Sequence, residues 1–348
     1  MEENYLRVRG ENRTRWDAEI DRRVKRIAIL GTVAWKSFAQ RRRDMMCKKT
    51  GSGEKYLEGT KTMSDITNDD EHWSLVIKPK KKWLDINLRE IYRYRDLIRL
   101  FVNRDFVTVY KQTILGPFWF VLNPLFTTLV YTFVFSGLAK IPTDGVPQTL
   151  FYYGGSMLWG YFSNCLTSAS DTFTSNSSLF GKVYFPRLTV PISKVFSNLI
   201  SAGIQFATLV AFYVYYVLAG ATVRPSWWAF CVPLLFAQLA ALGTGFGMII
   251  SSLTTKYRDL RQLVGFGIGL WMYATPIVYP LSQVPAKYKW IMELNPVSAP
   301  IEAFRFASYG VGGPSASMLL SSIAVTAAVV FLGLVLFNRN ERTFVDVV

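Results

Sequence analysis

Histidine and cysteine are scarce in this chain of 348 residues. His72 is the only histidine, and the three cysteines, Cys47, Cys165 and Cys231, are scattered along the sequence. A single histidine argues against a histidine-based catalytic site and against a metal site with several histidines. The cysteine positions fit neither a disulfide framework nor the ligand spacing of a zinc site. The sequence therefore predicts no metal site and no cofactor within this chain.

A motif that binds ATP phosphates is also missing. The pattern G-x-x-x-x-G-K-[ST] occurs nowhere, and Gly181-Lys182 is followed by Val183 without the upstream glycine. The long apolar runs carry almost no charge, since Asp171 and Lys194 lie near their ends. Ion-coupled carriers usually keep ionisable groups inside the membrane, so a proton- or sodium-driven pump is disfavoured. Active transport by this chain would need energy from another protein.

Long apolar runs are absent before about Pro117 and dominate the sequence after it. The chain is 51% hydrophobic and has a mean hydropathy of +0.21 despite 39 Lys+Arg, so charged and apolar residues are segregated. A run of roughly 20 apolar residues crosses a bilayer as a helix. Six such runs predict an all-α polytopic membrane protein with spans at about 117–139, 148–170, 190–219, 227–254, 263–281 and 315–337.

Basic residues outside the runs predict the orientation. Residues 1–117 carry 26 Lys+Arg and 17 Asp+Glu, and the short loops on the same side are also richer in basic residues than the opposite loops. By the positive-inside rule both termini are cytoplasmic. The apolar patch at 27–35 starts late and is followed by RRR, so a basic surface helix fits it better than a signal peptide. We expect a plasma-membrane protein with membrane lipids, and no nucleic acid, as partners.

The sequence divides into three parts. Residues 1–75 form a basic, partly flexible extension, 76–115 an amphipathic region, and 116–348 the six-span domain. Between Trp83 and Asp105 apolar residues recur at helical spacing, which predicts a surface helix parallel to the membrane. The other face of this helix carries Arg89, Arg93, Arg95 and Arg99. A simple membrane anchor and a gate beside a cytoplasmic entrance both fit this pattern.

The loop at 176–191 is unusually apolar. Leu179, Phe180, Val183 and Tyr184 fall on one face of a short predicted helix, which Pro186 would stop. An apolar patch that faces water favours a partner. Docking of a separate cytoplasmic protein and an interfacial helix against lipid are equally good interpretations of this loop alone.

Aromatic residues are frequent in the first, second and fifth predicted spans. Rings at span ends are normally interface anchors, whereas rings near the middle would line a path on which sugar faces stack. Gly265, Gly267 and Gly269 in the fifth span would allow close helix approach. The candidate channel aromatics are Phe118, Trp119, Phe126, Trp159, Phe266, Trp271, Tyr273 and Tyr279.

The outer segment 282–313 is too long for a tight turn. Its prolines and apolar residues predict two short helices that dip into the outer leaflet around Asn295-Pro296. Glu302 and Arg305 are spaced i,i+3, and an exposed pair of this kind contributes only tenths of a kcal/mol.

Six motifs in order resemble one family, the membrane subunits of type-2 ABC exporters for cell-surface polysaccharides such as O-antigen, capsule and teichoic acid. The resemblance covers about residues 74–348. The motifs are YRDLIRLFVNRDFVTVYKQTILGPFWFVLNP, KVYFPRLTVP, YRDLRQLV, TPIVYP, NPVSAPIEAFR and NERTFVDVV.

The resemblance implies a transporter subunit rather than an enzyme. Two copies of this chain would pair with two ATP-binding subunits, which would hold ATP and Mg. The cargo would be a polysaccharide on undecaprenyl pyrophosphate, moved outward across a bacterial inner membrane. A passive channel without an ATPase partner, and an exporter of capsule or teichoic acid, remain the alternatives.

The resemblance also assigns roles to segments. Residues 176–187 would be the coupling helix on the ATPase, 83–101 the gate helix, and 283–311 the outer gate helices, with spans one and five lining the channel. Arg89, Arg93, Arg95 and Arg99 are then candidates for pyrophosphate contacts beside Trp83. The candidate coupling residues are Leu179, Phe180, Lys182, Val183, Tyr184, Phe185 and Arg187.

Overall fold

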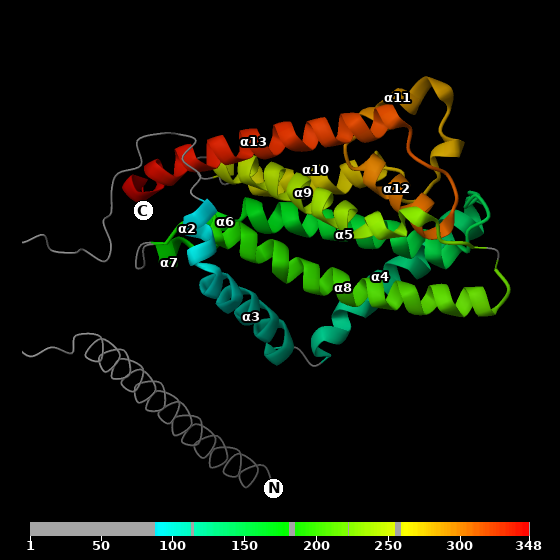
Figure 1. The fold of residues 1–348 in the computed structure, drawn as a ribbon, viewed down its shortest axis with the longest axis horizontal. Coiled ribbons are helices and arrows are strands. Elements are labelled where there is room, and N and C mark those ends of the chain that lie inside the picture. The colour runs from blue at the N-terminus through cyan, green and yellow to red at the C-terminus, as the bar shows by residue number, and fades with distance from the viewer. Residues whose placement is uncertain (1–87, 113–114, 181–184, 222, 255–258, 348) are drawn as a thin grey trace, which may run out of the picture. The chain divides into compact units, whose positions relative to one another are not determined.

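The regular structure of the described chain is helical. The computed structural model describes residues 88–112, 115–180, 185–221, 223–254 and 259–347, and no strand occurs within these ranges. Figure 1 shows the helices α2 (Leu88–Arg93), α3 (Arg95–Gln112), η2 (Gly116–Phe118), α4 (Trp119–Tyr131), η3 (Thr132–Leu138), α5 (Gln148–Ser170), α6 (Thr172–Ser175), α7 (Ser177–Phe180), α8 (Thr189–Leu218), η4 (Trp227–Cys231), α9 (Val232–Thr254), α10 (Leu260–Tyr273), η5 (Leu281–Gln283), α11 (Ala286–Leu294), α12 (Ser298–Tyr309) and α13 (Ala316–Val347).

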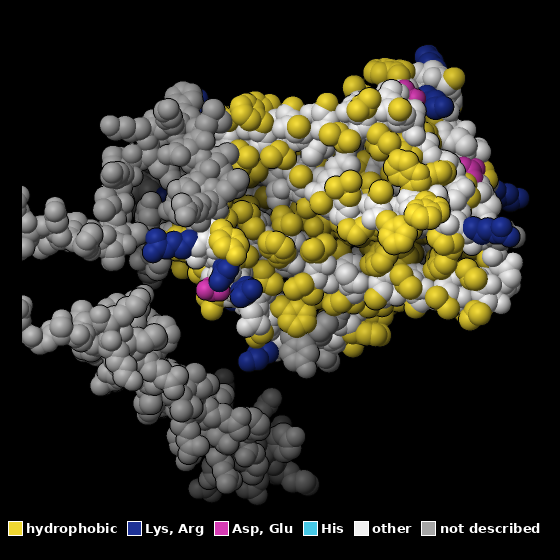
Figure 2. Space-filling model, in the orientation of Figure 1, with side chains coloured by type: hydrophobic (Ala, Val, Ile, Leu, Met, Phe, Trp, Pro, Cys, Tyr) yellow, Lys and Arg dark blue, Asp and Glu magenta, His cyan; other side chains and the backbone are white. Residues whose placement is uncertain are grey.

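Four helical segments of the described chain are long and apolar enough to cross a membrane. They are Trp119–Leu138, Thr189–Leu218, Trp227–Thr254 and Ala316–Arg339. This finding fits a polytopic membrane protein, and Figure 2 shows hydrophobic side chains over most of the face in view, with Lys and Arg side chains gathered toward its two ends. The second and fifth predicted spans correspond to α5, which has 23 residues, and to α10, which has only 14. Helix α10 is short because the sequence that follows it, TPIVYP, contains two prolines.

Helix α5 is the centre of the bundle. Most of its residues are buried, and it contacts α4, α8, α9, α10 and α12. Its buried side chains include Tyr152, Tyr153 and Trp159, so a large part of its surface is aromatic. Because protein rather than lipid surrounds α5, its sequence tolerates more glycine and hydroxyl groups than a helix that faces lipid on all sides.

Glycines of α9 bring this helix against the backbone of α5. A Cβ atom at Gly243 would lie 2.7 Å from the Phe162 carbonyl oxygen, and one at Gly247 would lie 2.5 Å from the Leu166 carbonyl oxygen. Small residues four apart let two helices in a membrane approach closely. This G-x-x-x-G pair is therefore a packing contact, and the sequence analysis did not single it out.

The opposite face of α9 approaches α13 in the same way. A Cβ atom at Gly333 would lie 2.6 Å from the Gly245 carbonyl oxygen. By contrast, a Cβ atom at Gly265, Gly267 or Gly269 of α10 would meet nothing within 4 Å. The close approach predicted for these three glycines is therefore not made with other described parts of this chain.

The substitution Gly247→Ala should destabilise the bundle, because the new methyl group would collide with backbone atoms of α5 that cannot move independently. Overpacking of this kind costs about 1–3 kcal/mol. The matched control is Gly160→Ala in α5, where a Cβ atom meets nothing within 4 Å. We expect Gly247→Ala to lower the unfolding temperature in detergent while Gly160→Ala leaves it unchanged or raises it slightly. Equal effects would contradict the close packing of α5 and α9.

Candidate functional site

The loop end of the bundle is the end where α5, α9 and α13 finish and α8 begins. Figure 1 shows α2, α6 and α7 at this end. The expected short helix of 176–187 is described as α7 over Ser177–Phe180, and the chain resumes at Phe185. Three predicted coupling residues, Lys182, Val183 and Tyr184, lie outside the described residues.

Five phenylalanines form a continuous row across the loop end, which we call the phenylalanine row. Phe173 of α6 stacks on Phe337 of α13 with ring centroids 4.7 Å apart. Phe180 of α7 lies 6.1 Å from Phe173 and 5.6 Å from Phe185. Phe185 in turn contacts Phe101 of α3 at 5.9 Å. The row thus connects α7 to the last span through Phe173 and to the amphipathic helix through Phe185.

The predicted coupling residues that are described pack inward. Phe185 and Arg187 are 4% and 8% exposed, and the Arg187 guanidinium carbon lies 5.4 Å from the Phe180 ring centroid. Leu179 and Phe180 are half-buried and contact the small cluster of Phe101, Phe185 and Val190. Leu179 and Phe180 are therefore only partly available to a water-facing patch, and Phe185 and Arg187 are buried against Phe180 of α7.

Ion pairs attach two further helices to the loop end. The Lys194 ammonium of α8 lies 2.7 Å from the Asp105 carboxylate of α3, and both side chains are largely buried. The Arg261 guanidinium of α10 lies 2.7 Å from the Asp171 carboxylate that follows α5. Lys194 and Asp171 were noted in the sequence only as charges near span ends, because sequence spacing gives no sign of partners about 90 residues away.

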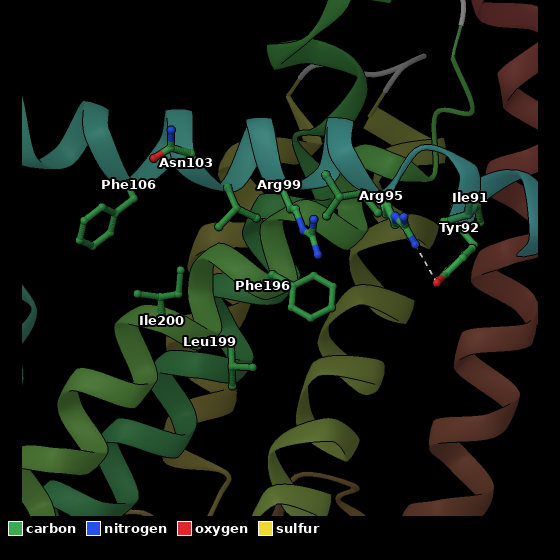
Figure 3. A pocket seen from close by; sticks show the side chains of 11 residues that line it. Ile91, Tyr92, Arg95, Arg99, Asn103, Phe106, Phe196, Leu199 and Ile200 are labelled. Carbon is green, nitrogen blue, oxygen red and sulfur yellow. Dashed lines mark hydrogen bonds between the residues drawn. The ribbon is translucent and has the colours of Figure 1, made fainter.

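The arginines of the amphipathic helix are not equivalent. Arg93, Arg95 and Arg99 are exposed, but only Arg95 and Arg99 line a cavity between α3 and α8 (Figure 3). Arg89 belongs to α2, and its side chain is not among those described; Trp83 lies outside the described residues. The structure therefore separates two of the candidate pyrophosphate contacts from Arg93.

The eight candidate channel aromatics fall into two groups. Phe118, Trp119 and Phe126 near and along α4, and Phe266 and Tyr273 of α10, are between 39% and 68% exposed. The other three are packed within the chain. Trp159 is buried against Trp271 with ring centroids 6.2 Å apart, and the Tyr279 hydroxyl donates to the Tyr273 carbonyl oxygen.

The indole nitrogen of Trp271 donates to the Asn295 side-chain oxygen at 3.1 Å. The Asn295 amide nitrogen donates to the Ala274 carbonyl and to the Thr275 hydroxyl at 3.0 and 2.9 Å. Asn295 therefore fastens the end of α10 to the junction between α11 and α12. The sequence marked Asn295 only as the point between two short helices.

Helix α12 is buried within the bundle. Ile301 and Phe304 are 1% exposed, whereas Trp290 and Leu294 of α11 are more than 60% exposed. The two short helices lie on either side of Asn295-Pro296, at the end of the bundle opposite the loop end (Figure 1). The apolar side chains that the sequence suggested for a membrane surface are thus exposed on α11 and mostly buried on α12.

Glu302 and Arg305 form a buried ion pair, so the small contribution expected for an exposed pair of this spacing does not apply to them. The guanidinium lies 2.7 Å from the carboxylate, and each side chain is 5% exposed. Arg305 also donates to the Ile277 carbonyl oxygen at 3.0 Å and lies 3.9 Å above the centre of the Phe151 ring. Burial raises the pKa of the Glu302 carboxyl, and the Arg305 charge opposes that shift. The pair connects α12 to α5 and to the segment after α10.

Residues 96–309, which span both ends of the bundle, match the family described as ABC-2 type transporter. The chain belongs to this family. This match confirms the expected membrane subunit of a type-2 ABC transporter, and the matched residues begin after the N-terminal extension.

Three curated relatives carry the name O-antigen export system permease protein RfbA. One from Klebsiella pneumoniae is 29% identical over 255 residues, which cover 72% of this chain and 95% of the relative. A second from the same organism is 28% identical over 254 residues, with the same coverage. One from Myxococcus xanthus is 25% identical over 262 residues, or 74% of this chain and 98% of the relative. The permease described here is thus similar to these proteins over nearly their full length.

The substitution Arg305→Ala should destabilise the ABC-2 permease strongly, because it leaves the Glu302 carboxylate buried without its partner. Loss of one member of a buried pair costs about 3–5 kcal/mol. The double substitution Glu302→Gln with Arg305→Met should recover much of the lost stability. Thermal unfolding in detergent measures both effects.

Asp96 and Arg99 provide a matched control for this experiment. They have the same i,i+3 spacing, but their side chains are 80% and 79% exposed. We expect Arg99→Ala to change the unfolding temperature little, since exposed pairs contribute about 0–1 kcal/mol. Similar losses from Arg99→Ala and Arg305→Ala would show that the buried pair is not a structural connection.

Proposed function

We propose that this chain is the transmembrane subunit of an ATP-driven exporter of lipid-linked polysaccharide. The cargo is an O-antigen-type glycan on undecaprenyl pyrophosphate, moved from the cytoplasmic to the outer face of the plasma membrane. The observation that supports this proposal best is the family match over 96–309, together with relatives named as O-antigen export permeases.

In this proposal the energy comes from two copies of a separate ATP-binding subunit. These subunits hold ATP and Mg, for which this sequence has no phosphate-binding motif. The segment 176–187 is the coupling helix, with 181–184 and the outer surface of α7 against the ATPase. The phenylalanine row then carries a displacement of α7 to α13 and α3, because its rings are in contact and protein interiors transmit strain.

A second copy of this chain completes the channel. Helix α10 has no buried residue, and its exposed side chains include Leu263, Phe266, Leu270 and Tyr273. Its three glycines are open to a neighbouring helix. We assign α5 and α10 as the second and fifth of six spans. The exposed rings Phe118, Trp119, Phe126, Phe266 and Tyr273 line the path, and Trp159 and Trp271 position α10 behind it.

The remaining segments act as gates. Helices α2 and α3 lie at the cytoplasmic entrance, where Arg93 is the candidate for pyrophosphate contacts that lies outside the cavity lined by Arg95 and Arg99. Helices α11 and α12 form the outer gate, and both termini are cytoplasmic. These roles correspond to the three parts of the sequence, namely the extension 1–75, the amphipathic region 76–115 and the six-span domain 116–348. Residues 1–75 precede the part shared with the family, and we assign them an additional tethering contact.

Two other functions compete with this proposal. Capsule and teichoic-acid exporters share the same family resemblance and differ in the glycan. A passive channel would require no ATPase partner. Co-purification of an ATPase would distinguish an exporter from a passive channel. The surface glycan that is lost when the gene for this chain is deleted would identify the kind of exporter.

The substitution Tyr184→Asp should release the ATPase, because it places a charge in the apolar face proposed to dock. The experiment is a detergent pull-down of the chain co-expressed with the ATP-binding subunit encoded beside it. The matched control is Tyr288→Asp, on a half-exposed tyrosine of α11 at the opposite end. If both variants retain the ATPase, the assignment of 176–187 as the docking segment is wrong. If no ATPase co-purifies even with the wild-type chain, the exporter proposal is wrong.

Transmission of movement through the phenylalanine row should be experimentally distinguishable from docking of the ATPase. The substitution Phe337→Leu removes the ring that stacks on Phe173 but keeps the site apolar. We expect the ATPase to co-purify normally while surface display of the polysaccharide falls severalfold. Phe331→Leu, on an exposed ring of the same helix, is the control and should leave display unchanged. If Phe337→Leu leaves surface display of the polysaccharide normal, the phenylalanine row does not transmit the movement of α7.

A further inference from the structure

A cavity of about 840 Å³ lies between the amphipathic helices α2 and α3 and the span α8 (Figure 3). One wall is formed by Phe196, Leu199 and Ile200, whose i, i+3, i+4 spacing places them on one face of α8. These apolar side chains are between 40% and 49% exposed. Ile98 and Val102 of α3 face them across the cavity. The cavity therefore offers apolar walls to a flexible apolar chain.

The same cavity carries two cations. Arg95 and Arg99 line it from α3, with Arg99 above Phe196 and Arg95 beside Tyr92 (Figure 3). The Arg95 guanidinium donates one hydrogen bond to the Tyr92 hydroxyl at 2.8 Å, which leaves most of its five N–H donors available. Arg99 lies 3.6 Å from Asp96, and both side chains are about four-fifths exposed, so this pair is weak. Two guanidinium groups over an apolar cavity fit the phosphate of a lipid.

A second cavity indicates that a lipid bound here has two acyl chains. It has a volume of about 420 Å³ and lies between α8 and α9, lined by Phe206 and Phe236 among others. Phe196 and Leu199 line both cavities, so they form a ridge with an apolar trough on each side. A lipid with two acyl chains can occupy both troughs, whereas the single chain of a polyprenyl carrier can occupy only one.

We propose that this site binds one anionic phospholipid of the surrounding membrane, with its phosphate on Arg95 and Arg99 and its two acyl chains on either side of Phe196 and Leu199. The inference requires only that α8 spans the bilayer, and it does not rest on the export function. The Asp105–Lys194 pair attaches α3 to α8. The bound lipid would attach the part of α3 that precedes Asp105 to the same helix.

Native mass spectrometry of the full chain, titrated with palmitoyl-oleoyl phosphatidylglycerol, tests the headgroup contact. The double substitution Arg95→Gln and Arg99→Gln should weaken binding about thirtyfold, from about fivefold for each basic side chain near an anionic lipid. The matched control is Arg93→Gln with Lys111→Gln, which removes the same charge from exposed positions outside the cavity. An equal loss in both double variants would overturn the proposal in favour of diffuse attraction.

The substitution Gly203→Phe tests the second chain. Gly203 lines the smaller cavity, and a Cβ atom there meets nothing within 4 Å. The new ring should weaken phosphatidylglycerol binding severalfold and leave one-chain lysophosphatidylglycerol unaffected. Unchanged binding of both lipids would overturn the two-chain assignment.

Undecaprenyl pyrophosphate is the third probe. If it displaces phosphatidylglycerol at far lower concentration, the site belongs to the transported lipid and the phospholipid assignment fails. If phosphatidylglycerol keeps the site, the proposal stands. The pull-down of the ATPase is a separate readout, so a failure of the lipid site leaves the test of the exporter intact.

Discussion

The close approach of α9 to α5 is the contact on which the rest of the bundle depends. In a membrane, packing replaces the hydrophobic effect as the force that joins helices, so backbones that meet through glycine define a rigid pair. Helix α5 extends from this contact to both ends of the bundle. At the loop end it leads into Asp171 and Phe173, and at the other end it provides Phe151 beneath Arg305.

The two ends are held by different interactions, which suits different roles. The phenylalanine row consists of ring contacts without a fixed hydrogen-bond geometry, so its members can slide by small amounts while they stay in contact. The Glu302–Arg305 pair is buried, directional and also bonded to the Ile277 carbonyl, so it has one favourable arrangement. In the proposed exporter, a displacement that enters at α7 would therefore be passed on by the phenylalanine row and resisted at the Glu302–Arg305 pair.

The sequence predicted the helical class, the apolar runs and the short helices around Asn295, because these features depend on local composition. It did not predict which charges are buried. Asp96–Arg99 and Glu302–Arg305 have the same spacing, and only tertiary packing makes one exposed and the other enclosed. The glycines show the same limit. GxGxG at 265–269 and GTGFG at 243–247 look alike in sequence, yet only the second meets a neighbouring backbone within the described chain.

The unequal coverage of the helices also bears on the proposed pairing of two copies of this chain. Helix α10 has no buried residue, although Trp271, Asn295 and the Asp171–Arg261 pair fix its two ends. A helix that is fastened at both ends but uncovered along its length presents a surface of defined position. Such a surface suits a second copy better than lipid, because three glycines on it expose backbone that lipid tails cannot pack as closely as another helix can. The three glycines of α10, which meet no neighbour within the described chain, are thus the residues that the proposed second copy would contact.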